Sequence, residues 1–284
     1  MQKNTYGRDF YRGRHQATVY SARAVLSIVL DALPPVHSAV DFGCGVGTWL
    51  SVLQEKGVGE IQGLDGSWVE PDLLEIPQKN FRQVTFDERI AFDRRYDLAI
   101  SLEVAEHLPE RNAGGFVDSL AAASDFILFS AAIPFQGGIS HVNEQWPGWW
   151  ADVFAGRGYK ALDVVRRNIW NDRQIPAWYR QNILLFAAEG HVHRIAPPAA
   201  DEHDTAYPIS LVHPDIYLSK VDQLQSVKNQ LQSAGTTMQS VTGSWKLFRK
   251  ALKKYVRNKL AGLSGKTAEP DAQQQDRARE KKHP

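Results

Sequence analysis

The chain has 284 residues, 43% of them hydrophobic, and a formal net charge of +1. This length and composition predict a globular protein with one large domain and an extension. No apolar run approaches the roughly 18 residues that span a bilayer, and the first residues contain no apolar signal core, so we expect a cytoplasmic protein. The single cysteine, Cys44, excludes an internal disulfide.

A helix is the first predicted element, over residues 17–33, and Pro34 and Pro35 end it. Strand-like runs then alternate with helical stretches, which is the pattern of a doubly wound parallel sheet. The candidate strands cover residues 39–42, 61–64, 82–86, 98–102, 126–131, 161–165 and 183–187. After residue 190 the sequence becomes polar and contains prolines, which predicts a linker.

A glycine-rich turn follows the first strand, in the sequence VDFGCGVGTWL at residues 40–50. Glycine has no Cβ, so Gly43, Gly45 and Gly47 allow the backbone to lie against a ligand, with a helix N-terminus just beyond. The spacing G-x-G-x-G differs from the dinucleotide fingerprint G-x-G-x-x-G, because the third glycine falls one residue early. The turn therefore predicts a cofactor site of another kind.

Acidic residues end or follow the next strands. Asp65 closes the second strand about 20 residues after the turn, where a Rossmann-type unit places a carboxylate that binds a ribose diol. Asp97 begins the fourth strand, and residues 103–107 follow its carboxyl end. Ligands in such sheets bind beyond these strand ends, so we expect the functional residues there.

On these residues the chain resembles the class I S-adenosylmethionine-dependent methyltransferases, over about residues 6–188. GCGVGTW, the acidic strand end at Asp65 and YDLAISLEVAEHLP are the most specific parts. The resemblance implies an α/β fold, a Rossmann-like seven-stranded sheet with helices on both faces, in the order 3-2-1-4-5-7-6 with the last strand antiparallel. It also implies that the three glycines approach the amino-acid part of S-adenosylmethionine and that Asp65 holds its ribose hydroxyls.

The adenine contacts depart from the family pattern. Many members carry an aspartate near the end of the third strand, where this chain has Thr85. Asp87, two residues on, is a candidate substitute, while Phe86 either packs on the adenine or belongs to the core. The candidate cofactor-binding residues are Asp41, Gly43, Cys44, Gly45, Gly47, Asp65, Gly66, Phe86, Asp87, Leu102 and Glu103.

Three ionisable residues after the fourth strand are spaced so that they converge on a helical turn. Glu103, Glu106 and His107 lie three and four positions apart, which places them on one face. Grouped carboxylates are costly unless they are solvated, protonated or neutralised, and a divalent cation neutralises them. His141, in the loop after the fifth strand, borders the same crevice. These four residues are the candidate catalytic and metal-ligating set.

The set resembles the E-x-x-E-H…H pattern of small-RNA 2′-O-methyltransferases and ubiquinone-biosynthesis O-methyltransferases, in which it holds a divalent metal against substrate hydroxyls. Mixed oxygen and imidazole ligands suit Mg²⁺, Mn²⁺, Fe²⁺ or Zn²⁺. Glu-His-Leu-Pro also recurs in metal-free members of the superfamily. If this chain resembles those metal-free members, His107 is an acid–base residue or a structural residue. The sequence leaves the metal-binding, acid–base and structural roles of His107 open.

The acceptor is indicated by a second resemblance, to a bacterial subgroup often found beside sugar and polysaccharide genes, through HVNEQWPGWW and WYRQNILLF. We therefore expect O-methylation of a sugar hydroxyl or glycan precursor. N-methylation of an amino sugar or another small molecule without a metal is one alternative. A non-catalytic cofactor-binding module of a membrane-tethered assembly is another.

The same two segments supply aromatic and polar side chains near the expected acceptor. The rings of Trp146, Trp149, Trp150, Trp178 and Tyr179 suit a flat substrate or, alternatively, pack in the core or at its rim. Residues 143–145 are candidates for binding acceptor hydroxyls. Residues 180–182 are candidates for satisfying backbone groups at a strand edge.

These features divide the chain into five parts. We expect a helical cap at residues 1–37, with a cofactor lid formed by Tyr6, Phe10, Tyr11 and Arg12 ahead of the first helix. The remaining parts are the methyltransferase domain at 38–190, a linker at 191–215, a helical extension at 216–264 and a disordered tail at 265–284. A break in the extension is expected around Gly235 and Gly243.

Residues 245–260 of the extension contain seven lysines and arginines and no acidic residue, while the rest of the chain is mildly acidic. Trp245, Phe248, Leu252, Tyr255 and Val256 fall on one face of this helix. It is suited to an anionic membrane interface, which would make the protein peripheral to the inner membrane face, or to packing on the body or on a partner subunit. A nucleic-acid arm is a third reading, but the acidic body argues against duplex binding.

Overall fold

The computed structural model describes residues 8–196 and 210–264. A seven-stranded sheet has the order β3-β2-β1-β4-β5-β7-β6, and β7 runs antiparallel to both of its neighbours. The expected Rossmann-like sheet and its strand order are therefore confirmed. The strands are β1 (Ser38–Phe42), β2 (Glu60–Asp65), β3 (Phe81–Gln83), β4 (Leu98–Leu102), β5 (Phe126–Ser130), β6 (Tyr159–Leu162) and β7 (Leu184–Ala188).

Two strands differ from their expected bounds by more than one residue at an end. β3 stops at Gln83, because its partner β2 ends at Asp65, which is paired with Gln83. Phe86 therefore lies outside the strand. β6 ends at Leu162, and Asp163 accepts a hydrogen bond from the backbone N–H of Arg166, the first residue of the next helix.

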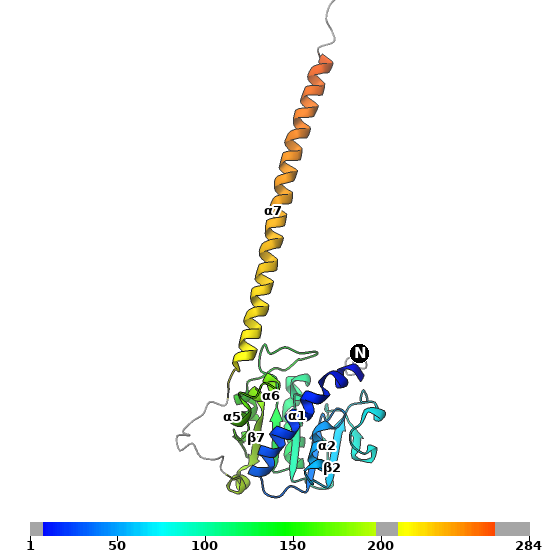
Figure 1. Cartoon of the computed structure of the whole chain (residues 1–284), viewed down its shortest axis with the longest axis vertical. Helices are drawn as coiled ribbons and strands as arrows, with labels where there is room; N and C mark the ends of the chain where they lie inside the picture. Colours follow the sequence, from blue (N-terminus) through cyan, green and yellow to red (C-terminus); the bar gives the residue numbers. More distant parts are fainter. Residues whose placement is uncertain (1–7, 197–209, 265–284) are drawn as a thin grey trace, which may run out of the picture. The chain divides into compact units, whose positions relative to one another are not determined.

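Helices cover both faces of the sheet. Side chains of β5 alternate, with Phe126 and Leu128 in the core cluster that contains α1 and α2, and Ile127 and Phe129 in the cluster that contains α3 and α4. Figure 1 shows α1 and α2 lying together on one face. The helices are α1 (Arg8–Ala32), α2 (Thr48–Glu55), α3 (Ala113–Ala123), α4 (Pro147–Ala155), α5 (Arg166–Ile169), α6 (Ala177–Asn182) and α7 (Pro214–Ser264).

Helix α1 is longer than the sequence predicts and forms part of this layered core. Val25, Leu26 and Val29 are fully buried against the sheet. The helix begins at Arg8, so the expected lid residues 10–12 lie inside it rather than ahead of it. Tyr6 lies outside the described residues.

Helix α7 is continuous from Pro214 to Ser264, so the expected break around Gly235 and Gly243 is wrong. A glycine inside a helix costs about 1 kcal/mol relative to alanine, which weakens a long helix without ending it, whereas a proline would end it. No proline follows Pro214 within α7. The expected tail at 265–284 and the linker residues 197–209 lie outside the described part of the chain.

The chain divides into two compact units, residues 1–219 and 220–284. The first unit contains the whole sheet, and the second contains most of α7. Among the described helices, none combines the length and the apolar character that crossing a membrane requires.

Candidate active site

The glycine turn between β1 and α2 has the backbone conformation that its sequence demands. Gly43, Gly45 and Gly47 have φ angles of 82°, 56° and 90°, in the region that L side chains rarely adopt. The Gly43 N–H donates to the Leu64 carbonyl at 2.7 Å, which ties the turn to β2. A Cβ on Gly43 would lie 2.3 Å from Cγ2 of Val104. The turn is thus packed against the segment that follows β4.

Two buried carboxylates lie beside this turn. Asp65 accepts hydrogen bonds from the backbone N–H groups of Gly45 and Gly66, both at 2.6 Å. Burial raises the pKa of Asp65, and these bonds oppose the shift. Burial, and then the charge of Asp65, raises the pKa of Asp41 well above its ordinary value. Two buried acids that repel each other fit a cationic ligand, and S-adenosylmethionine carries sulfonium and ammonium charges.

Trp68 is a neighbour of this site that the sequence interpretation missed. Its indole covers Gly66, where an added Cβ would come within 2.2 Å of the ring, and its hydrogen bond lowers the pKa of Asp65. The available signal was an aromatic residue three positions after the strand-end acid. Asp65 and Gly66 therefore lie under an aromatic ring.

Phe86 and Asp87, the candidates for adenine contacts, are engaged elsewhere. The Phe86 ring centroid lies 5.4 Å from that of Phe116 and 6.2 Å from that of Phe42, so Phe86 is part of the core on the α3 side. Asp87 accepts a hydrogen bond from the side chain of Asn112 at 3.2 Å. Leu102 ends β4 half-buried.

Cys44 packs inside the turn. Burial, followed by the charges of Asp41 and Asp65, raises the pKa of its thiol well above the ordinary value. Its Sγ would lie 2.7 Å from a Cβ on Gly63, so the sulfur fills the space beside β2. The residue acts as a small apolar side chain rather than as a reactive thiolate.

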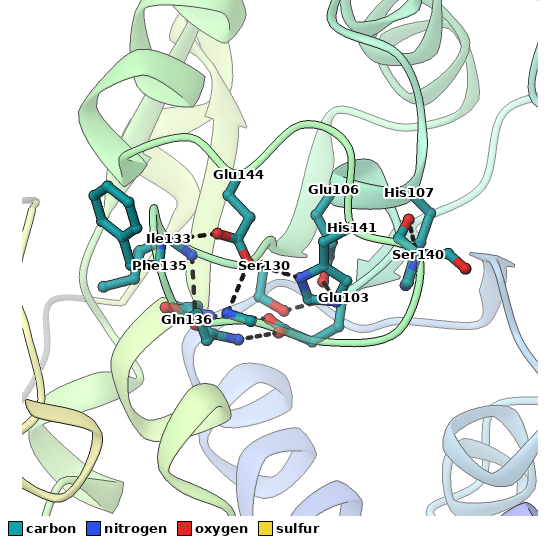
Figure 2. A network of polar contacts seen from close by, with 12 residues as sticks. Glu103, Glu106, His107, Ser130, Ile133, Phe135, Gln136, Ser140, His141 and Glu144 are labelled. Atoms are coloured by element: carbon teal, nitrogen blue, oxygen red, sulfur yellow. Dashed lines mark hydrogen bonds and ion pairs between the residues drawn. The ribbon is translucent and has the colours of Figure 1, made fainter. Parts of the chain in front are cut away.

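The acidic and histidine side chains after β4 form a cluster of three (Figure 2). One ligand atom from each of Glu106, His107 and His141 lies within 4.8 Å of the others. Glu106 and His107 belong to η3, the 3-10 helix Ala105–His107. The loop that carries His141 is held there because the N–H groups of Val142 and Asn143 donate to the Glu106 carbonyl, at 2.9 and 3.0 Å.

Glu106 carries the least satisfied charge of the cluster. The residue is fully buried, and neither carboxylate oxygen has a hydrogen bond within the described part of the chain. His141 Nε2 lies 4.0 Å from Oε1 of Glu106. Burial, and then the charge of Glu103, raises the pKa of Glu106 well above its ordinary value, while the nearby backbone N–H groups of Glu106 and Ala132 oppose the shift. A buried carboxylate of this kind is costly until a cation or a proton neutralises it, so the donor set fits a divalent metal.

His141 is oriented by a second carboxylate. Its Nδ1 lies 2.9 Å from Oε1 of Glu144, and that contact aims Nε2 at Glu106. Glu144 also accepts hydrogen bonds from the N–H groups of Phe135 at 2.7 Å and Gly137 at 2.8 Å. Histidine ligands of metals commonly donate their other ring N–H to a carboxylate in this way.

His107 lies against His141, with ring centroids 4.9 Å apart in an edge-on arrangement. Burial, followed by the neighbouring His141, lowers the pKa of His107. Its Nδ1 is 3.4 Å from the carbonyl oxygen of Ser140, which can only accept, so the proton of the neutral ring belongs on Nδ1. His107 is therefore a neutral imidazole with its lone pair on Nε2 near pH 7.

Glu103, the fourth expected ligand, lies outside the group of three. Its carboxylate accepts hydrogen bonds from Asn182 at 3.1 Å and from Gln136 at 3.0 Å. Burial raises its pKa, and the bonds from Asn182, Ser130 and Gln136 lower it. The sequence interpretation placed Asn182 at a strand edge and missed Gln136. Asn182 reaches Glu103 because β7 is antiparallel, which brings the start of β7 to the carboxyl end of β5.

The aromatic residues of the two acceptor segments are mostly packing residues. Trp150 is buried, and its ring is 4.8 Å from that of Trp149. Tyr179 packs edge-on against Trp49 at 5.6 Å, with Trp178 beside it at 6.0 Å. Trp146 is 43% exposed. It is the ring among these that the structure presents to solvent beside the His141 loop.

The polar residues of the same segments are also engaged within the protein. Asn143 accepts a hydrogen bond from Gln145 while its own buried Nδ2 has no partner among the described residues, and Glu144 is bonded to its own loop. Arg180 donates to the carbonyl oxygens of Trp170 and Ile175, so it satisfies backbone groups between α5 and α6 rather than at the expected strand edge. These hydrogen bonds do not test whether residues 143–145 bind acceptor hydroxyls, so that role stays a prediction.

Together, the strand order, the glycine turn and the buried acids at the strand ends define a Rossmann-like methyltransferase. A family model described as a methyltransferase domain matches residues 13–170, more than half of the chain. The chain belongs to this family, and it is an S-adenosylmethionine-dependent methyltransferase enzyme. A comparison with curated proteins gave no match.

Among solved structures, a chain of the complex between the Haloferax volcanii Trm112 methyltransferase activator and a methyltransferase is 15% identical, over 66% of this chain and 95% of that chain, with a TM-score of 0.47. Streptomyces venezuelae DesVI is 14% identical over 63% and 94%, with a TM-score of 0.47. The magnesium protoporphyrin IX methyltransferase of Synechocystis PCC 6803 with bound SAH is 21% identical over 62% and 84%, with a TM-score of 0.45.

Proposed function

We propose that this enzyme transfers a methyl group to a hydroxyl oxygen of a sugar or glycan precursor, with a divalent metal held by Glu106, His107 and His141. The observation that carries the proposal is the buried Glu106 carboxylate, which has no hydrogen bond among the described residues and faces His141 Nε2 at 4.0 Å. Water or a donor side chain would normally satisfy such a group. A metal ion satisfies it and also explains why two imidazoles lie beside it.

The methyl donor and the cluster share one edge of the sheet. Gly43 of the turn is packed against Val104, and Val104 lies between Glu103 and Glu106 in the chain. The ends of β1 and β4 are neighbours in the parallel sheet. Ligands of this fold bind beyond the carboxyl ends of the strands, so an acceptor at the cluster meets a donor held by the turn.

The chain's own residues provide for the proton of the acceptor. Methyl transfer forms a bond between the acceptor oxygen and the methyl carbon while the carbon–sulfur bond breaks, and the hydroxyl proton must leave. His107, whose pKa is lowered, is neutral and can accept that proton at Nε2 only while no metal occupies this nitrogen, because the neutral ring has one lone pair; with a metal bound there, the proton would leave to water. A bound divalent cation would lower the pKa of the hydroxyl and help to orient it.

A sugar is the acceptor class that the rim of the site supports. Trp146 exposes its ring beside the loop that carries His141, and rings with polar neighbours suit carbohydrate faces. An amine acceptor, as in N-methylation of an amino sugar, would need no metal. N-methylation would therefore not explain why the buried Glu106 carboxylate lacks a hydrogen bond.

A methyl-transfer screen over nucleotide sugars, glycan fragments and amino sugars, with Mg²⁺ or Mn²⁺ and with EDTA, tests the proposal. We expect transfer to a hydroxyl acceptor that EDTA abolishes and added metal restores. Glu106→Gln should lower kcat/KM at least 100-fold, because it removes a metal-ligand charge. Glu110→Gln, an exposed change in the next turn of the chain, should leave kcat/KM unchanged.

Three results would overturn the proposal. Transfer to an oxygen acceptor at full rate in EDTA would remove the metal, and transfer to nitrogen alone would replace the hydroxyl with an amine. A wild-type enzyme that binds S-adenosylmethionine but methylates only acceptors without a sugar would refute the acceptor class.

A further inference from the structure

The C-terminal half of α7 combines exposed apolar side chains with a high density of positive charge. We call residues 245–260 the basic segment. Seven of these residues are lysine or arginine and none is acidic. All side chains that the structure describes in it, through residue 258, are exposed. The segment therefore has charge and apolar surface that α7 itself leaves uncovered.

The apolar side chains share one face of the helix, because they recur at three- and four-residue spacings. Trp245 and Phe248 stack at 5.4 Å between ring centroids, with 10° between the ring planes. The exposed fractions of the face are 57% for Trp245, 55% for Phe248, 49% for Leu252, 62% for Tyr255 and 46% for Val256. Exposed aromatic and branched residues that share one helix face form an apolar surface of the kind that binds another molecule or a membrane.

The positive charges adjoin this face without a counter-charge. Residues 223–264 contain no aspartate or glutamate, and Asp222 is the last acid of α7. In the segment, Arg249, Lys253 and Lys246 fall on the side next to the apolar face at helical spacing. An occupant of the apolar face must therefore also carry negative charge nearby.

A second copy of α7 does not meet that requirement. Pairing two basic segments along their apolar faces would bring both sets of lysines and arginines together with no acid to form interhelical salt bridges. A nucleic acid would neutralise the charge but would stack only on the aromatic rings, which leaves Leu252 and Val256 in water. Anionic lipid supplies both an acyl boundary and phosphates.

We propose that the basic segment binds the surface of an anionic bilayer, with the apolar face in the headgroup and acyl boundary and the basic side chains at the lipid phosphates. The helix lies in the plane of the membrane, since it carries too much charge to cross it. This surface holds the methyltransferase at the membrane. The inference stands on α7 alone and is independent of which acceptor or metal the active site takes.

The full-length protein is tested by flotation with vesicles of phosphatidylcholine alone and of phosphatidylcholine with phosphatidylglycerol. We expect flotation only with phosphatidylglycerol, and weaker binding as salt is added. Lys250→Gln with Lys253→Gln and Lys254→Gln should weaken binding about fivefold for each charge removed. Trp245→Ser with Phe248→Ser should also release the protein, because the apolar face no longer inserts.

The same helix offers matched controls. Lys220→Gln with Lys228→Gln removes charge, and Leu224→Ser with Leu231→Ser removes exposed apolar side chains, 71% and 69% exposed, outside the segment. These variants should float as the wild type does. Circular dichroism and calorimetric binding of S-adenosylmethionine confirm that every variant remains folded.

Three results would overturn the inference. The first is equal flotation with and without anionic lipid. The second is unchanged flotation of the charge variant or of the Trp245→Ser and Phe248→Ser variant. The third is a vesicle-independent partner, seen either as a dimer in light scattering that Trp245→Ser disrupts or as nucleic-acid binding that excludes vesicles.

Discussion

Glu144 connects the parts of the loop that places His141. Its carboxylate bonds the backbone of Phe135 and Gly137 and the Nδ1 of His141 (Figure 2). Phe135 has a φ of 66°, a conformation that is costly for a bulky residue and that persists only when its surroundings hold it. One carboxylate thus fixes both the strained loop and the ring orientation of a proposed metal ligand.

Replacing this carboxylate tests its positioning role at the residue scale. We expect Glu144→Gln to weaken Mn²⁺ binding by roughly 10–100-fold, as measured by calorimetric titration of the full-length protein, because an amide holds the His141 tautomer less firmly. Binding of S-adenosylmethionine should change little, since Glu144 lies outside the glycine turn. Glu110→Gln serves as the control for removal of a nearby exposed carboxylate.

The two titrations separate the possible outcomes for Glu144. If Mn²⁺ binds the variant as tightly as the wild type, Glu144 does not position a metal ligand. If binding of both Mn²⁺ and S-adenosylmethionine collapses, the residue serves the fold of the whole site instead.

At the scale of elements, the turn between β1 and α2 is coupled to the segment after β4. The φ of Gly43 is 82°, and an added Cβ would meet Val104 at 2.3 Å. Gly57, after α2, has a similar φ of 92° but nothing within 4 Å of an added Cβ. The two positions thus share the backbone conformation and differ in the space around them.

This pair makes the contribution of crowding measurable. Gly57→Ala should cost about 1–2 kcal/mol of unfolding free energy, the penalty for a left-handed L residue. Gly43→Ala should cost about 1–3 kcal/mol more, because the methyl group overpacks against Val104, and it should abolish binding of S-adenosylmethionine. Urea unfolding and calorimetric titration measure both effects.

A second substitution completes this experiment. Adding Val104→Ala to Gly43→Ala should recover part of the lost stability, because it removes the methyl groups that the new Cβ meets. Equal costs at Gly43 and Gly57 would show that Val104 yields freely and that the turn is not packed as described.

The same elements show what the sequence could predict. The strand order and the convergence of Glu106, His107 and His141 were predictable, because periodicity and strand-end chemistry are local signals that the family resemblance completes. The contact between Asn182 and Glu103 was not, since it joins two side chains 79 residues apart in the chain that meet only through the pairing of β7 with β5. The continuity of α7 was also missed, because glycine lowers helix propensity without specifying an end.

At the scale of the whole molecule, the carboxyl ends of the strands collect four acids with raised pKa values: Asp41, Asp65, Glu103 and Glu106. Burial is the largest cause for each. A carboxyl whose pKa is higher in the folded protein than in the unfolded chain binds its proton more tightly when folded. Its ionisation therefore lowers the free energy of unfolding as pH rises. Without a ligand the site destabilises the folded protein, and a bound cationic ligand offsets this effect.

Asp41, which lies outside the proposed metal ligands, gives this idea its sharpest test. Ligand-free protein should lose unfolding free energy as pH rises from the ordinary aspartate value, near 3.8, through the raised pKa of Asp41. Asp41→Asn should flatten that decline and add on the order of 1 kcal/mol at pH 8, while it weakens binding of the cationic cofactor. Asp93→Asn, an exposed change, should alter neither property. Urea unfolding across pH measures the free energy of unfolding, and calorimetric titration measures the binding of S-adenosylmethionine. If the free energy of unfolding of the wild type does not decline with pH, Asp41 ionises without cost to stability.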